Sequence, residues 1–159
     1  EVGVEFHSLS KTFNMTGWRI GFAVGHPEVL SGLGRVKTNI DSGVFQAVQE
    51  AGTAALNHFD TPIPEIIKIY ERRRDVMIKG LREIGLELDQ PKATFYLWIR
   101  VPSGYTSAQF VALLLDQGGI VSTPGNGFGE EGEGYFRMAL TVDEKRCKEA
   151  IERLKRIKF

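Results

Sequence analysis

The spacing of apolar side chains predicts a long helix in the middle of the chain and several shorter ones. Between residues 64 and 84, apolar residues recur every three or four positions, which is typical of a helix with one buried face. Gly85 is expected to end this helix, and the proline-rich segment Thr61–Pro64 is expected to be a linker before it. The shorter helices are expected to begin near His26, Phe45, Thr106 and Thr141.

Two of these helix starts carry a capping pattern. Thr106 is followed three residues later by Gln109, and Thr141 is followed in the same way by Glu144. In such a capping box the hydroxyl and the longer side chain satisfy each other's backbone N–H groups. We therefore expect Thr106 and Thr141 to be the N-caps of these two helices.

Segments rich in β-branched and aromatic residues predict strands between the helices. Thr94–Val101 has the clearest strand composition. Trp18–Val24 is apolar on both faces, as is common for strands buried within a sheet. The other strands are expected at Val2–Phe6, Leu86–Leu88, Ile120–Ser122 and Tyr135–Leu140. The segment after Gly85 is thus predicted to form a compact α+β unit.

Composition excludes several classes of protein. The 159 residues are 42% hydrophobic, enough for one sizeable core or two small ones. Twenty basic and 20 acidic residues balance, so we expect no nucleic-acid partner. The single cysteine, Cys147, cannot form an internal disulfide and fits a reducing, cytoplasmic setting. No apolar run reaches the ~20 residues of a membrane span, and the three histidines show no metal-ligand spacing.

The segment Ser8–Gly21 carries the clearest chemical signal. Lys11 lies in a short polar turn after Ser8 and Ser10, and Arg19 follows between two glycines. A lysine amine that acts as nucleophile and base must be neutral, and burial beside a cation favours that form. A guanidinium binds phosphate through two hydrogen bonds, and hydroxyl groups can complete the shell. Taken singly, these residues would more simply be a surface lysine and a salt-bridged arginine.

The order Ser-x-Ser-Lys and then Gly-x-Arg-x-Gly resembles the Schiff-base lysine segment of the class I aminotransferases. These are the aspartate-aminotransferase-like branch of the fold-type-I enzymes, which use pyridoxal 5'-phosphate (PLP). The resemblance implies that Lys11 is the catalytic lysine that carries PLP, that Arg19 grips the phosphate, and that Ser8 donates to it.

The same resemblance implies the fold class, α/β, as the C-terminal part of the fold-type-I transferase fold with a small α+β C-terminal domain. Residues 1–63 would be a remnant of the large PLP-binding domain, residues 64–85 a bridging helix, and residues 86–159 the small domain. The lysine segment lies well past the middle of family members. We therefore expect the chain to correspond to their C-terminal portion, and these 159 residues alone to be inactive.

Arg137 is a second candidate for the site. An arginine within the apolar strand Tyr135–Leu140 is costly unless it is paired, and on its own it would more simply face water from an edge strand. The family places its substrate-carboxylate arginine on a similar strand at a similar distance from the lysine. The resemblance thus implies that Arg137 binds the α-carboxylate of the amino acid through a bidentate pair.

Three neighbouring features remain open from the sequence. The glycine-rich segment Pro124–Gly129 resembles one that closes over substrate in the family, but an ordinary connection fits equally well. Phe95 and Tyr96 could line the substrate side, although strand aromatics more often belong to a core. Lys37 lies close to the stretch where some members bind a second substrate carboxylate, although a solvated helix end is the simpler interpretation.

The function implied is amino transfer between an α-amino acid and a 2-oxo acid, in a cytoplasmic homodimer. The motif is closest in wording to aspartate and LL-diaminopimelate aminotransferases. One alternative is another fold-type-I chemistry, of the β-lyase or aminocyclopropane-carboxylate synthase type, which product analysis would separate. The other is an aminotransferase-like sensor domain of a transcription regulator, which the preceding sequence would reveal.

Overall fold

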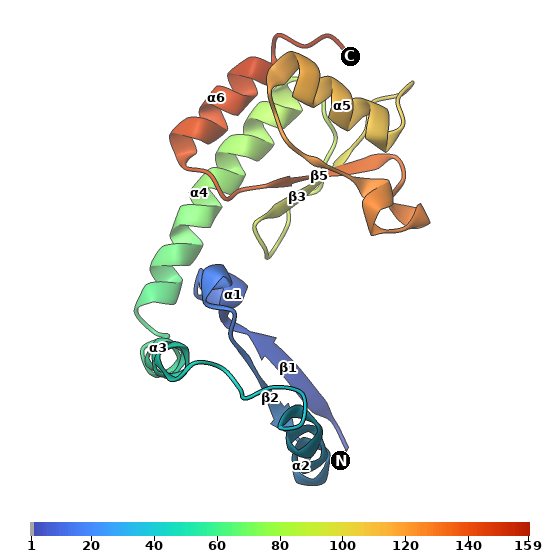
Figure 1. Ribbon diagram of the computed structural model, residues 1–159. Coiled ribbons are helices and arrows are strands. Elements are labelled where there is room, and N and C mark those ends of the chain that lie inside the picture. Colours follow the sequence, from blue (N-terminus) through green and yellow to red (C-terminus); the bar gives the residue numbers. More distant parts are fainter. Residues whose placement is uncertain (1) are drawn as a thin grey trace. The chain divides into compact units, whose positions relative to one another are not determined.

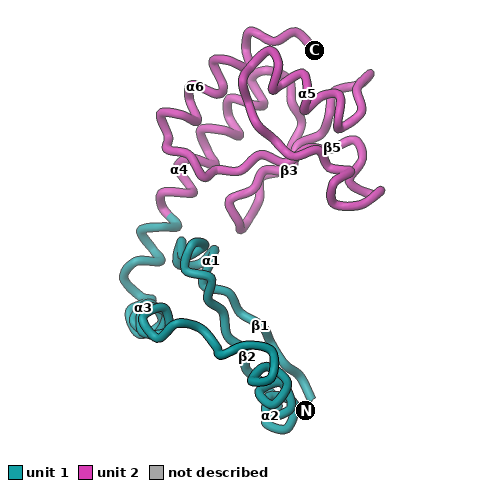
Figure 2. The backbone as a smooth tube through the Cα atoms, in the orientation of Figure 1, with its two compact units in different colours: residues 1–67 teal, residues 68–159 magenta. Residues whose placement is uncertain are grey.

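The computed structural model describes residues 2–159. The chain divides into two compact units, of which unit 1 extends to Ile67 and unit 2 runs from Lys68 to Phe159 (Figure 2). The division falls within the long helix α4 (Pro62–Glu83).

Unit 1 contains a two-stranded antiparallel sheet and short helices. Strands β1 (Val4–Ser8) and β2 (Gly21–Gly25) pair along their full length. Between them lie α1 (Leu9–Thr12) and the 3-10 turn η1 (Thr16–Trp18). Two longer helices follow, α2 (Pro27–Lys37) and α3 (Gln46–Asn57), which confirm the helices expected after His26 and from Phe45.

The predicted strand Trp18–Val24 was wrong in extent and in burial. Arg19 adopts a left-handed backbone conformation, with φ 53° and ψ 49°, which interrupts the extended chain so that β2 begins only at Gly21. The sheet is also largely exposed, because Phe22 and Val24 of β2 remain open to solvent. Among the described residues of unit 1, the buried large apolar side chains are those of Leu9 and Met15.

Unit 2 is an α+β layer structure with its own core. Its antiparallel sheet has the order β3-β5-β4, formed by β3 (Tyr96–Arg100), β5 (Tyr135–Ala139) and β4 (Thr123–Pro124). Helices α4, α5 (Ser107–Gly118) and α6 (Glu144–Leu154) lie on one side of this sheet (Figure 1). The fully buried core side chains include Leu81, Leu97, Ile99, Phe110, Leu114, Phe136, Leu140 and Leu154.

The two faces of the sheet differ because neighbouring residues of a strand point to opposite sides. Leu97 and Ile99 of β3 are buried in the core. Tyr96 and Trp98 alternate with them and therefore lie on the other face. Arg137 of β5 is the register partner of Trp98, so it belongs to this outer, aromatic face.

Helix α4 has the predicted apolar face but begins earlier than expected. Met77, Ile78 and Leu81 of α4 are buried, which confirms the amphipathic helix that the apolar spacing predicted. The helix begins at Pro62, however, so the segment Thr61–Pro64 is mostly a helix start rather than a linker. Proline is tolerated there because the first helical N–H groups have no partner within the helix.

The capping predictions had opposite outcomes. Thr106 is the N-cap of α5 and forms both halves of the capping box with Gln109, as expected. Helix α6 is instead capped by Asp143, whose carboxylate accepts a hydrogen bond from the backbone N–H of Arg146 at 2.8 Å. Thr141 lies before this cap, so its assignment as N-cap was wrong.

Two short strands were also misplaced. Leu86–Leu88 forms only an isolated bridge between Leu88 and Ile99. The strand expected at Ile120–Ser122 lies at Thr123–Pro124, where Thr123 pairs with Arg137. The strand expected at Tyr135–Leu140 is present as β5.

Candidate functional site

The predicted lysine segment folds as a tight turn between β1 and β2. Ser8 is the N-cap of α1, and its hydroxyl oxygen accepts a hydrogen bond from the backbone N–H of Ser10 at 3.2 Å. Lys11 follows in the last turn of this short helix, with an exposed side chain. The sequence predicts a buried amine, but no described element of unit 1 covers Lys11 from solvent.

Arg19 is held against the same turn. The backbone N–H of Leu9 donates to the carbonyl of Ile20 at 3.3 Å, and the hydroxyl of Thr16 donates to the carbonyl of Ser10 at 3.0 Å. The guanidinium Nη1 of Arg19 donates to the carbonyl of Thr16 at 2.8 Å. These bonds place Ser8, Lys11 and Arg19 on one compact turn.

The backbone of Arg19 is strained. A left-handed conformation costs a non-glycine residue about 1–2 kcal/mol, and such strain persists where the surroundings impose it. Here the imposing contacts are the hydrogen bonds on either side of Arg19. This conformation could not be predicted from the sequence, because the residue that usually signals it is glycine.

Gly21, after Arg19, is needed for the pairing of the two strands of unit 1. A Cβ at Gly21 would lie 2.5 Å from the carbonyl oxygen of His7, so Gly21 is required by the pairing of β2 with β1. Nothing lies within 4 Å of the corresponding position at Gly17.

The donor set of this turn fits an aldehyde that carries a phosphate, as PLP does. Lys11 supplies a primary amine. A guanidinium has five N–H donors, so donation from Nη1 of Arg19 to Thr16 leaves others for a phosphate. The hydroxyl of Ser8 acts as an acceptor toward Ser10, which leaves its hydrogen free to donate.

Arg137 belongs to unit 2, on the outer face of the sheet. Its guanidinium carbon lies 4.2 Å from the ring centre of Tyr96 and 4.6 Å from that of Phe128. Within residues 2–159, no carboxylate lies within 4 Å of the Arg137 side-chain nitrogens. Since β5 is the central strand in the order β3-β5-β4, the alternative of an edge-strand arginine is wrong.

The glycine-rich segment forms two short 3-10 turns, η2 (Gly125–Phe128) and η3 (Glu130–Gly132). Their backbones touch, because a Cβ at Gly125 would lie 2.0 Å from the carbonyl oxygen of Gly132. This contact requires glycine at both positions and carries Phe128 to Arg137.

Glu133 fastens the same segment to α5. Its carboxylate accepts hydrogen bonds from the backbone N–H of Ser107 at 2.7 Å, from the Ser107 hydroxyl at 2.8 Å, and from the N–H of Gly134 at 3.1 Å. The bond from the Ser107 backbone is the main reason why the pKa of Glu133 lies below its ordinary value of 4.5. The Ser107 side chain is itself fully buried.

Phe95 and Tyr96, at the start of β3, have different surroundings. Phe95 packs against the core cluster and stacks on Tyr70. Tyr96 lies on the outer face beside Arg137. The sequence does not indicate Phe128 as a neighbour of Arg137, because it lies in a segment without a regular period.

Lys37 does not point to a free anion-binding position. Its amine donates to both carboxylate oxygens of Asp41, one turn later. The hydrogen bond from Lys37 lowers the pKa of Asp41. The helix end is thus closed by its own ion pair, which agrees with the simpler interpretation.

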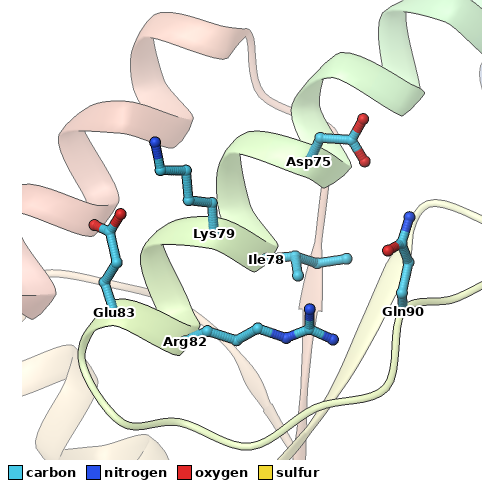
Figure 3. A pocket seen from close by; sticks show the side chains of 6 residues that line it. All are labelled: Asp75, Ile78, Lys79, Arg82, Glu83 and Gln90. Carbon is cyan, nitrogen blue, oxygen red and sulfur yellow. The ribbon is translucent and has the colours of Figure 1, made fainter.

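A separate hollow of about 720 Å³ lies along α4 and the segment after it (Figure 3). It is lined by Asp75, Ile78, Lys79, Arg82, Glu83 and Gln90. Charges of both signs line it, and Arg82 is engaged with the carbonyl of Leu88 at 3.2 Å. This arrangement favours no single ligand chemistry.

Residues 2–159 hold neither a cluster of metal-ligating side chains nor a helix that could span a membrane. No group of three or more His, Cys, Asp or Glu side chains is arranged to hold a metal ion. No helix in that range combines the length and the apolar character needed to cross a bilayer.

Comparison with known proteins places the chain in a family. The profile described as "Aminotransferase class I and II" matches residues 3–154. LL-diaminopimelate aminotransferases from Syntrophobacter fumaroxidans and Aquifex aeolicus are 58% and 59% identical over all 159 residues. Each match covers 100% of this chain and 41% of the relative, so the chain spans about two fifths of their length.

A solved structure has the same fold. The aminotransferase from Staphylococcus aureus matches 96% of this chain with a TM-score of 0.89 and 38% identity, and the match covers 40% of that protein. The mixed α/β architecture and this match confirm the predicted fold class, the C-terminal part of a fold-type-I transferase. The chain therefore belongs to the class I and II aminotransferase family.

Proposed function

We propose that the full-length protein is a PLP-dependent LL-diaminopimelate aminotransferase, which exchanges an amino group between this diamino acid and a 2-oxo acid. The observation that carries the proposal is the identity of 58% and 59% to two proteins of that name, over the whole of this chain. The Lys11 turn and the half-buried guanidinium of Arg137, which pairs with no carboxylate of the described residues, supply groups that the reaction needs.

In this proposal the turn of unit 1 holds the cofactor. Arg19 and Ser8 bind its phosphate through charge-assisted and hydroxyl hydrogen bonds. Lys11 would supply the amine that links to its aldehyde carbon with loss of water. When bound, PLP supplies a ring that takes up the electron pair released at the substrate's α-carbon.

Lys11 then acts as the acid–base group. With substrate bound, the Lys11 amine would take the proton from the α-carbon and would later give a proton back. The hydroxyls of Ser10 and Thr12 cannot replace it, because a hydroxyl is far too weak a base near neutral pH. Arg137 holds the α-carboxylate so that the α-carbon is presented in one orientation.

We also propose the arrangement in which this works. Residues 1–63 would belong to the large PLP-binding domain, residues 64–85 to a bridging helix and residues 86–159 to the small domain, in a cytoplasmic homodimer. Phe6 and Phe45 of unit 1 are 74% and 76% exposed, which supports their burial by further parts of the assembled protein. Light scattering of the full-length protein measures the assembly state directly.

The covalent link is the direct test. Reduction of the PLP-loaded full-length protein with borohydride, followed by peptide mapping, should place the label on Lys11. Lys11→Ala should lose the label and at least about 10²–10⁴-fold of the activity, the usual contribution of a positioned base. Lys37→Ala is the matched control and should keep both. A label on Lys37, or on no lysine of this chain, would refute the assignment.

Substrate identity is tested separately. LL-diaminopimelate with 2-oxoglutarate should give glutamate without release of ammonia, whereas a β-lyase would release ammonia. Arg19→Ala should mainly weaken cofactor binding, by about 10- to 100-fold for one charged hydrogen-bonding group. Excess PLP should restore its activity, while it should not restore that of Lys11→Ala.

A further inference from the structure

The guanidinium of Arg137 lies between two aromatic rings. Tyr96, from β3, and Phe128, from η2, approach it to 4.2 and 4.6 Å. No ring contact joins Tyr96 to Phe128 in the described part of the chain, so the two rings flank the cation rather than stack on each other. A cation within about 6 Å of an aromatic ring centre is attracted to the ring face.

The ring of Phe128 also contacts Trp98. Trp98 is the register partner of Arg137, and its ring meets Phe128 edge to face at 5.6 Å. Trp98 also stacks on Tyr135 at 5.7 Å. The outer sheet face therefore carries a connected set of rings, and Arg137 is inserted into it.

The segment that carries Phe128 is fixed at two points. The backbone contact between Gly125 and Gly132 closes it, and Glu133 joins its end to the N-terminus of α5. Phe128 itself is 51% exposed, so the packing of the core does not hold it in place. Its position depends on the segment and on its contacts with Trp98 and Arg137.

Because the rings of Tyr96 and Phe128 cover the faces of the guanidinium, only its edges are left to bind a ligand. All five N–H donors of a guanidinium lie in its plane and point outward from its edge. A carboxylate that forms two parallel hydrogen bonds must lie in that same plane. Two rings that fix the plane therefore fix the direction from which a carboxylate is bound.

We propose that Tyr96 and Phe128 are positioning residues that hold the Arg137 guanidinium in a fixed plane for a substrate carboxylate. The inference rests on the proposed function, in which Arg137 binds the α-carboxylate. Without the rings the side chain would have to be ordered at each binding event. Immobilising one such side chain lowers affinity by about 2- to 10-fold.

The test uses the PLP-loaded full-length protein and two non-reacting probes, propionate and its uncharged analogue propionamide. Competitive inhibition by each probe gives the preference for a carboxylate. Phe128→Leu and Tyr96→Leu should each weaken propionate binding about 2- to 10-fold and leave propionamide unchanged. Tyr96→Phe, which keeps the ring, should bind propionate as the wild type does.

A double-mutant cycle separates positioning from general structure. In an Arg137→Leu background, Phe128→Leu should have no further effect on propionate binding, because it acts through the arginine. The visible spectrum of bound PLP should be unchanged in every variant. The positioning role is refuted if Phe128→Leu weakens the binding of propionate and of propionamide alike. It is also refuted if Phe128→Leu weakens propionate binding equally in the wild-type and the Arg137→Leu backgrounds.

The outcomes also separate this inference from the proposed function. If Arg137→Leu keeps the preference for propionate, Arg137 does not bind the carboxylate and the functional assignment fails. If Arg137→Leu abolishes the preference while both ring variants keep it, the assignment stands and only the positioning role fails.

Discussion

Gly80 of α4 packs tightly against Ile151 of α6 in unit 2. A Cβ at Gly80 would lie 2.5 Å from Cγ1, 2.6 Å from Cγ2 and 2.7 Å from Cδ1 of Ile151. Ile151 is only 6% exposed, so its side chain cannot turn into solvent. We therefore expect Gly80→Ala to destabilise unit 2, although alanine is the better helix former.

The magnitude follows from two opposing effects. Overpacking a buried site costs about 1–3 kcal/mol. Replacing glycine by alanine inside a helix contributes about 1 kcal/mol in the other direction. The net effect of Gly80→Ala should be a loss of about 0–2 kcal/mol in the free energy of unfolding.

A partner substitution makes the prediction sharper. Ile151→Ala removes all three contacting atoms and on its own should cost about 2–5 kcal/mol through the cavity it leaves. In that background the Gly80→Ala methyl group enters free space and also favours the helix. The double variant should therefore be more stable than Ile151→Ala by about 1 kcal/mol or more.

Hydrogen–deuterium exchange of peptides from α4 and α6 in the full-length protein measures the local free energy of opening. Wild type, both single variants and the double variant complete the cycle. The packing argument would be refuted if Gly80→Ala raised protection by the full helix-propensity gain and the two substitutions were additive.

Three other expectations concern single side chains. Arg137→Leu should cost about 2–4 kcal/mol of transition-state stabilisation, measured as a lower kcat/KM for the amino acid, while PLP stays bound; normal turnover would contradict its role. Asp143→Ala should cost about 1 kcal/mol by thermal unfolding and Thr141→Ala almost nothing; the reverse order would contradict the observed cap. The pKa of Glu133 is lowered on folding by its bonds from Ser107, so its stabilising effect is present above the ordinary value of 4.5 and is lost as the pH falls through the lowered pKa. The urea midpoints of wild type and Glu133→Gln should therefore differ at neutral pH and converge in acid, and a constant difference would contradict this.

The elements that the sequence predicted well are those with a local cause. Amphipathic spacing placed α4, and the Thr106–Gln109 capping box placed the start of α5, because both depend on residues within one or two turns. The start of α6 was misplaced because Thr141 and Asp143 are both good caps. Only the tertiary position of the chain decides which of them has its backbone in the required extended conformation.

The misjudged strands have a non-local cause. Leu86–Leu88 has strand composition but forms only one bridge, from Leu88 to Ile99 on the outer edge of β3, and composition alone cannot show how far such a pairing with a distant strand extends. The start of β2 was displaced by the left-handed backbone of Arg19, which the contacts of Thr16 and Ile20 impose. The motif drew attention to the side chain of Arg19 but could not predict its backbone conformation.

Arg137 could be predicted in part from its local sequence and in part only from the three-dimensional structure. Its charge within an apolar strand indicated either a carboxylate partner or an edge position, since burial without compensation is costly. The structure has a third solution, because β5 is central and the cation is compensated by ring faces from Tyr96 and Phe128. A protein carboxylate would have occupied the donors that the proposed substrate carboxylate would use. Rings stabilise the charge without using a single N–H group, so an arginine stabilised in this way is still able to bind an anion.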